Sequence, residues 1–291
     1  MRTWVSGASG FVGARLCARL RAAGHDVIGV DREVDVRDAA RVAESLAAAR
    51  PDALVHLAAV SSSAAAREEP ARAASVNYLG ARNVLEAMAR HAPSARLLLV
   101  GSGEVYGASE PGAPPFTERD PLAPRTDYAR TKACADLLGA ACAARGLDVV
   151  RVRPFNHTGP GQPPDFVAPA FAGQIARIAR GDGEPVLRVG NLDSVRDFLD
   201  VEDVIDAYEA LLRSSAPAGV YNVASGVGVR IGALLDALRE ASGAAFRVEV
   251  DPRRWRETDC VVGDARRLRE ATGWSPRTPF PLTLERLLAA A

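Results

Sequence analysis

A chain of 291 residues, 48% of them hydrophobic, is long enough to bury a sizeable core as one large α/β domain or as a domain with a smaller lobe. Lys and Arg number 36 and Asp and Glu number 36, so the formal net charge is zero and does not favour binding to nucleic acid or to an anionic membrane. The four cysteines form no CxxC pair, there is no signal-peptide pattern, and no run reaches the roughly 18 to 20 apolar residues of a membrane span, so we expect a cytoplasmic protein without a metal site.

Strand and helix patterns alternate through the first half of the chain. Strands are expected at residues 2–6, 26–30, 52–57, 96–100 and 148–152, and helices at 11–23, 38–49, 73–91 and 128–145. Short apolar strands separated by helices predict a parallel sheet with helices on both faces. Right-handed crossovers then make a doubly wound α/β fold of the Rossmann type.

The pattern loosens after residue 153. Further helices are expected near residues 166–180, 202–213, 231–242 and 282–290, with an extended, charged segment at 184–199. We expect residues 1–153 to form the sheet domain and residues 154–291 to form mainly a smaller lobe, with parts of 190–225 returning to the first domain. Such a lobe would cover the carboxyl edge of the sheet, where α/β enzymes hold their substrates.

The first strand leads directly into a glycine-rich turn that opens a helix. Its sequence is Gly7-Ala8-Ser9-Gly10-Phe11-Val12-Gly13. The first glycine allows a sharp turn, the second lets the backbone approach a pyrophosphate, and the third lets helix and strand pack closely. The helix N-terminus adds N–H groups and a positive dipole. We therefore predict that residues 1–153 bind a dinucleotide at this turn.

A carboxylate closes the second expected strand. Asp31 can accept hydrogen bonds from the hydroxyls of an adenosine ribose and would repel a 2′-phosphate, which favours NAD(H). Arg32 follows it, and a guanidinium there could pair with a 2′-phosphate. NADP(H) therefore stays possible.

Tyr128 and Lys132 lie four residues apart at the start of an expected helix, on one face. A phenol with a pKa near 10 is a poor acid–base group at neutral pH, and a neighbouring ammonium would lower that pKa. Tyr128 could then exchange a proton with a sugar or alcohol oxygen, while Lys132 could also bind the nicotinamide ribose. An ordinary exposed Tyr–Lys pair is the alternative.

A serine follows the buried strand that ends at Val100, in the segment Gly101-Ser102-Gly103-Glu104. The carboxyl end of a central strand is where a doubly wound fold places its chemistry. Ser102 would hydrogen-bond the reacting oxygen beside Tyr128, or else cap a turn.

Taken together, these motifs resemble the extended short-chain dehydrogenase/reductase family, in its sugar-nucleotide branch, over essentially the whole chain. Further matching segments are Asp35-Val36, His56-Leu57-Ala58-Ala59, Asn77 and Arg153-Pro154-Phe155-Asn156. The resemblance implies that Asp35 and Val36 lie on the adenine, that Asn77 supports the backbone of the active site, and that His56 is structural. It also implies a cofactor site containing Leu57, Ala58, Ala59, Asn77 and Pro154 besides the glycine turn.

The second half is similar to the GDP-4-dehydro-6-deoxy-D-mannose reductases. The similarity lies in Asn156-His157-Thr158-Gly159-Pro160-Gly161-Gln162, in the segment 189–193 and in the segments 196–204 and 221–226. It implies reduction of the C4 ketone of a GDP-linked 4-keto-6-deoxyhexose by NAD(P)H to give GDP-D-rhamnose. Substrate contacts are expected from Ser61, Ser102, Asn156, Gln162, Val189, Asn191, Arg196 and either Arg254 or Arg256.

Arg196 lies in extended backbone, where a guanidinium can grip a pyrophosphate bidentately. Its alternative is a surface ion pair with Asp197 or Asp200. The guanine base rests on the resemblance around residues 186–193, so dTDP or UDP sugars stay possible.

Other functions stay open. Glu104 could abstract a C5 proton, as a 4,6-dehydratase requires, or it could be a capping or supporting acceptor. A dehydratase or 4-epimerase would recycle tightly bound NAD. A protein that only senses NAD(H) or binds a partner would not need the Ser102, Tyr128 and Lys132 set.

The resemblance also implies a homodimer built from the helices at about 73–91 and 128–145. The second of these helices has an apolar face that contains Ala135, Leu138, Ala141 and Cys142. That face could pair with a second subunit or pack on the sheet.

Overall fold

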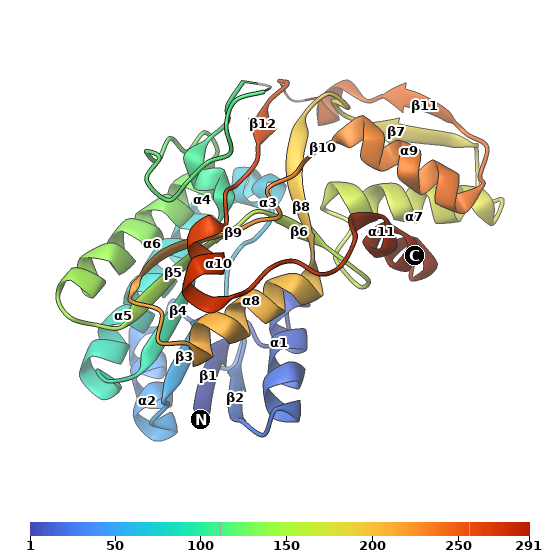
Figure 1. Cartoon of the computed structure of the whole chain (residues 1–291). Coiled ribbons are helices and arrows are strands. Elements are labelled where there is room, and N and C mark those ends of the chain that lie inside the picture. Colours follow the sequence, from blue (N-terminus) through green and yellow to red (C-terminus); the bar gives the residue numbers. More distant parts are fainter. Residues whose placement is uncertain (111, 256) are drawn as a thin grey trace.

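The computed structural model describes residues 1–110, 112–255 and 257–291 (Figure 1). Its central sheet has the strand order β2-β1-β3-β4-β5-β9, with parallel neighbours throughout. The strands are β1 (Arg2–Ser6), β2 (Asp26–Val30), β3 (Ala53–His56), β4 (Arg96–Val100), β5 (Val149–Pro154) and β9 (Gly219–Val223). The predicted doubly wound sheet is confirmed. Because β2 and β3 lie on opposite sides of β1, the glycine turn after β1 lies where the strand order reverses, the usual ligand position in such sheets.

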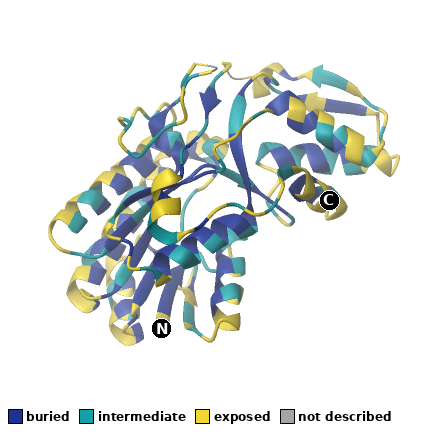
Figure 2. Ribbon diagram, in the orientation of Figure 1, coloured by how far each residue is buried: buried dark blue, intermediate teal, exposed yellow. Residues whose placement is uncertain are grey.

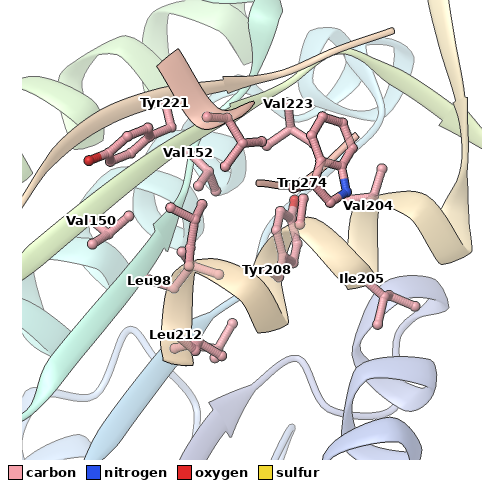
Figure 3. Packing of buried hydrophobic residues seen from close by; sticks show 14 of the residues in the cluster. Leu98, Val150, Val152, Val204, Ile205, Tyr208, Leu212, Tyr221, Val223 and Trp274 are labelled. Carbon is pink, nitrogen blue, oxygen red and sulfur yellow. The ribbon is translucent and has the colours of Figure 1, made fainter. Parts of the chain in front are cut away.

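Helices cover both faces of this sheet. One face packs against α1 (Phe11–Ala22) and α8 (Val201–Arg213), and the other against α2 (Ala39–Ala49), α5 (Gly80–His91) and α6 (Asp127–Ala144). Figure 3 shows Leu98, Val150 and Val152 of the sheet facing Val204 and Tyr208 of α8. Alternate strand residues such as Leu97 and Leu99 belong to the opposite core cluster, which explains why the strands read as continuous apolar runs.

The expected helix at 73–91 is interrupted. The chain forms α4 (Pro70–Ala74), then a π-helical turn η1 (Ser75–Leu79), then α5. Asn77 lies within η1 and is buried. Its side chain accepts from the Val60 N–H (2.8 Å) and donates to Val60 O (3.1 Å) and to Thr131 Oγ1 (2.9 Å). The π-helical turn thereby ties the loop after β3 to α6.

The apolar face of α6 packs inward. Ala135 is buried in the core cluster between α6, α5 and the sheet, Leu138 and Cys142 are partly buried against it, and Ala141 is exposed. Of the two uses expected for this face, packing against the sheet is the one observed for these three residues. Leu137, on another side of α6, is 59% exposed.

The second half builds a separate apolar cluster beside the sheet. It is formed by α7 (Val167–Ala179), β7 (Val186–Val189), α9 (Ile231–Ser242), β11 (Arg247–Val250) and α11 (Phe280–Ala289), which lie together at the upper right of Figure 1. Between the two parts, β8 (Val195–Asp200) pairs with β6 (Asn156–Thr158), β10 (Gly228–Arg230) and β12 (Cys260–Val261). Two shorter helices, α3 (Ser63–Glu68) and α10 (Arg266–Thr272), were not expected. The division into a dinucleotide-binding domain and a substrate lobe stays a prediction.

Burial follows the layers. The strands of the central sheet are mostly buried, and the outward sides of the flanking helices are exposed (Figure 2). Within the described ranges, no helix is long and apolar enough to cross a membrane.

Candidate active site

A cavity of about 760 Å³ lies along the carboxyl edge of the sheet. It is within the size range of ligand pockets in proteins. Its lining contains most of the residues expected from the sequence, namely Gly7, Ser9, Gly10, Phe11, Val12, Gly13, Asp31, Arg32, Asp35, Val36, Leu57, Ala58, Ala59, Ser61, Ser102, Glu104, Tyr128, Lys132, Pro154, Asn156 and Gln162. Residues from the glycine turn and from the second half of the chain therefore face one space.

The glycine turn has no room for side chains. A Cβ on Gly13 would lie 2.0 Å from Gly7 O, and one on Gly7, where φ is +71°, would lie 2.8 Å from Ala58 N. Both glycines are therefore required by the close packing of β1, α1 and the end of β3. This leaves bare backbone and the N-terminus of α1 facing the cavity, which fits a pyrophosphate.

At one end of the cavity, Asp31 Oδ2 accepts a hydrogen bond from Ser9 N (2.8 Å). The carboxylate therefore braces the glycine turn, and it retains lone pairs for a ribose hydroxyl. Asp35 is held by Arg37 (2.6 Å), a lining residue that the sequence reading missed. With Arg32, this end of the cavity carries two arginines near the expected adenosine position.

At the other end, Ser102 and Tyr128 line the cavity close to each other, and both are buried. Ser102 lies two residues after the end of β4, and Tyr128 lies in the first turn of α6. Thr126 caps that helix by accepting from Ala129 N (3.1 Å). Lys132 donates to Val100 O (2.8 Å) at the end of β4. Strand β4 and helix α6 thus hold the three side chains at the cavity wall.

Burial dominates the proton affinities here. It raises the pKa of Tyr128, the Glu104 carboxylate adds to the rise, and the Ser102 hydrogen bond opposes it. Burial also lowers the pKa of Lys132 to about 8. The expectation that Lys132 lowers the Tyr128 pKa is therefore not met: desolvation outweighs any such effect, and the ammonium is engaged with Val100 O.

Glu104 lines the cavity close to the Ser–Tyr pair. Its Oε2 accepts from Ser63 Oγ (3.0 Å) and Thr126 Oγ1 (3.5 Å). Burial raises the pKa of its carboxyl group, and its hydrogen bonds and Arg196 oppose the rise. Glu104 combines the supporting contacts of an acceptor with the position of an acid–base group.

Comparison with known proteins agrees with this arrangement. Residues 3–224 match the model of the NAD dependent epimerase/dehydratase family. The chain belongs to this family. It is 36% identical to a GDP-6-deoxy-D-mannose reductase from Pseudomonas aeruginosa, over 99% of this chain and 96% of that protein.

Solved structures of family members have the same fold. The structure of RMD from Pseudomonas aeruginosa complexed with NADPH matches with a TM-score of 0.89 at 35% identity, over 100% of this chain and 98% of that one. The UDP-glucose 4-epimerase of Thermus thermophilus, complexed with NAD, matches with a TM-score of 0.87 at 29% identity, over 100% and 98%. The predicted family resemblance is confirmed.

Other expected site residues lie elsewhere. Asn77 is not among the described residues of the cavity lining. Its hydrogen bonds to Val60 and Thr131 hold the backbone behind the cavity, which fits the supporting role that the resemblance implied. His56 is buried, with Nδ1 2.7 Å from Ser6 Oγ, which fits a structural role.

Arg196 and Arg254, which were expected to bind the diphosphate, pair with carboxylates of the chain, and their contacts with a substrate stay a prediction. Arg196 is paired with Asp259 (2.7 Å), a partner 63 positions away, in place of Asp197 or Asp200. Arg254 pairs with Asp251 (3.6 Å), and Arg256 lies outside the described residues. Val189 is buried in the second apolar cluster, and Asn191 donates to Thr258 Oγ1 (2.9 Å). In the part of the chain that the structure describes, Val189, Asn191, Arg196 and Arg254 do not line the cavity.

Several lining residues were missed. They include Arg72, Val76, His157, Phe166 and Tyr208. His157 could have been predicted, because it follows Asn156 in the segment that resembles the reductases. Arg72 and Val76 reach the cavity from α4 and the π-helical turn, and no local pattern marks them.

Proposed function

We propose that this protein reduces the C4 ketone of GDP-4-dehydro-6-deoxy-D-mannose to give GDP-D-rhamnose, with NAD(P)H as reductant. The observation that carries the proposal is that Ser102, Tyr128 and Lys132 line the same cavity as the glycine turn, with the Ser102 hydroxyl near enough to Tyr128 to lower its pKa. The full-length similarity to a GDP-6-deoxy-D-mannose reductase supports the choice of sugar and base.

The chain's own residues supply the proton and hold the reacting oxygen. NAD(P)H, when bound, provides the hydride for C4. Tyr128 donates its phenolic proton to the C4 oxygen as that oxygen becomes a hydroxyl, and Ser102 hydrogen-bonds the same oxygen. The raised pKa of Tyr128 keeps the phenol protonated at neutral pH, the form that a donor needs. Lys132 lies beside the pair, where it can hold the nicotinamide ribose.

NADH is the proposed preference, and NADPH is accommodated. Asp31 supports a free 2′-hydroxyl, and Arg32 and Arg37 supply positive charge for a 2′-phosphate. The ratio of kcat/KM for NADH and NADPH measures the balance. A large preference for NADPH would contradict the role given to Asp31.

Replacing Tyr128 with Phe removes the proton donor and keeps the ring. We expect kcat to fall by about 10²- to 10⁴-fold, with little change in NAD(P)H affinity. The assay is the loss of NADH absorbance with GDP-4-dehydro-6-deoxy-D-mannose, compared with the dTDP- and UDP-linked 4-keto-6-deoxy sugars. Tyr78→Phe, at a partly buried tyrosine outside the cavity lining, is the matched control. Near-full turnover by Tyr128→Phe would refute the mechanism.

A 4,6-dehydratase is the second candidate, because the Glu104 carboxyl lies in the cavity with a raised pKa. A dehydratase removes a C5 proton and retains its NAD between turnovers. Purified protein carrying NAD, together with Glu104-dependent deuterium incorporation at C5 in D2O, would favour it over the reductase.

We also propose a cytoplasmic homodimer. Free thiols at all four cysteines are typical of a reducing compartment. Leu137 of α6 and Leu79 of η1 are 59% and 41% exposed, in the two helical segments that the family resemblance assigns to subunit pairing. Covering them against a second copy would remove apolar surface from water.

A further inference from the structure

Arg15 connects two loops that the mechanism needs together. It lies on α1, one turn after Phe11, and its side chain is 28% exposed. Its Nη1 donates to Phe11 O (2.9 Å), and its Nη2 donates to Pro160 O. The guanidinium carbon lies 4.7 Å from the centre of the Phe11 ring. The Arg15 guanidinium therefore hydrogen-bonds both the first turn of α1 and the segment after β6.

Pro160 lies in the segment of residues 157–162, which is held together by hydrogen bonds between its own residues. Thr158 Oγ1 donates to Gln162 Oε1 (2.7 Å), and Gln162 Nε2 donates to His157 O (3.0 Å). Gly161 has a φ of +77°, which lets the chain turn back there. Residues 157–162 thus form a compact loop. A change in the position of Pro160 would therefore also move His157 and Gln162.

A second contact joins the same two parts. The Phe11 and His157 rings are stacked, with centroids 6.4 Å apart and an interplanar angle of 5°. Both residues line the cavity, as do Gln162, Pro163 and Phe166. The backbone that faces a pyrophosphate and the loop expected to face the sugar are therefore held together at two points.

We propose that Arg15 is a positioning residue that couples cofactor binding to the ordering of residues 157–166. A dinucleotide that orders the first turn of α1 also orders this loop through Arg15 and Phe11, so NAD(P)H and a guanosine diphosphate bind with positive cooperativity. By linkage, each ligand raises the affinity of the other by the same factor. The nucleotide-sugar part of this inference rests on the proposed function, whereas the link between turn and loop does not.

Arg19 offers a matched control. It lies one turn further along α1 and pairs with Glu202 (2.9 Å) and Asp206 of α8. Glu202 also contacts Arg15 Nε (3.5 Å). Arg19→Ala therefore removes a similar arginine and a similar α1–α8 contact, without touching Pro160 or Phe11.

The first measurement is hydrogen–deuterium exchange with and without saturating NADH. We expect NADH to slow exchange in residues 157–166 of the wild type and of Arg19→Ala, and to slow it much less in Arg15→Ala, where only the Phe11–His157 stacking remains. If Arg15→Ala fails to fold, Arg15→Gln takes its place, because it keeps most of the aliphatic part of the side chain and lacks the guanidinium. Equal protection of the loop in the Arg15 variants would overturn the inference.

The second measurement is the Kd of GDP, by calorimetry, with and without saturating NADH. We expect NADH to tighten GDP binding by about tenfold in the wild type and Arg19→Ala, within the usual range of such couplings, and by about threefold or less in Arg15→Ala. Undiminished coupling in Arg15→Ala, or a wild type without coupling, would contradict the inference. A chain that does not bind GDP but shows the Arg15-dependent loop protection would contradict the proposed substrate alone.

Discussion

Four ionisable side chains at or behind the Ser102 end of the cavity share one tendency: burial favours their uncharged forms. The pKa values of Tyr128 and Glu104 are raised, that of Lys132 is lowered to about 8 and that of His56 to about 3. A poorly solvated site strengthens hydrogen bonds to a developing charge. The same environment makes the fold sensitive to pH.

His56 provides a test of that sensitivity. Its pKa of about 3 in the folded state, against about 6.5 ordinarily, arises mainly from burial, with a smaller contribution from Lys132. Between these values the unfolded chain binds a proton that the folded chain does not. The free energy of unfolding should therefore fall as pH drops from about 6.5 to 3, by up to about 1.4 kcal/mol per pH unit from this residue.

The measurement is urea unfolding of the wild type and His56→Gln across this pH window. Carboxylates titrate in both proteins, so the difference between the two curves isolates His56. Parallel curves would show that His56 does not carry the effect.

At the scale of elements, the π-helical turn positions the catalytic helix through Asn77. Its three hydrogen bonds satisfy both backbone groups of Val60 and reach Thr131, next to Lys132. Asn77→Ala removes the partner of the part-buried N–H and C=O groups of Val60, at up to about 1–3 kcal/mol for each, whereas Thr131 keeps its hydrogen bond to Tyr128 O. We expect a lower free energy of unfolding, together with a kcat reduced by about tenfold or more because the support of α6 is lost.

Asn83 is the control for this prediction. It lies further along, on α5, and donates a single hydrogen bond to Val36 O (2.9 Å). Asn83→Ala should destabilise the protein less and leave kcat near the wild-type value. Equal effects of the two substitutions on kcat would argue against a specific role for Asn77.

The regular elements were predictable because their signals are local. The expected strands at 2–6 and 26–30 match β1 and β2, and helices such as 231–242 match α9. The π-helical turn was not predictable, because the contacts that accompany it come from Val60 and Thr131, which are distant in sequence. The short strands β10 and β12 depend on pairing with β8 and carry little pattern of their own.

The candidate site divides in the same way. Four parts of the site could be placed from the sequence because each lies at the end of a single predicted strand or helix. They are the glycine turn, Ser102, Tyr128 and Lys132. Arg196 could be named as a cation, but its pairing with Asp259 depends on β12 lying beside β8. Pairings that depend on the packing of distant segments could not be predicted from the sequence, and the role of Arg196 in substrate binding stays a prediction.

At the scale of the whole molecule, the proposed dimer depends on Leu137. Leu137→Glu places a charge where the second subunit would exclude water, which costs several kcal/mol if the interface forms there. We expect the wild type to sediment as a dimer and Leu137→Glu to dissociate at tenfold or higher concentration. Leu282→Glu, at a leucine of α11 that is 37% exposed, should leave the dimer intact. A monomeric wild type, or an unchanged Leu137→Glu dimer, would contradict the proposal.

The position of β9 limits how this protein can be re-engineered. Because residues 219–223 complete the sheet beside β5, the polypeptide leaves the sheet after Pro154, builds part of the second apolar cluster, returns and leaves again. A chimera that takes everything after about residue 153 from another protein would replace β9, an edge strand of the sheet, and α8 as well. Grafting a different sugar pocket therefore requires at least two separate inserts, one before α8 and one after β9, with α8, β9 and α10 kept from the host because all three pack against the sheet.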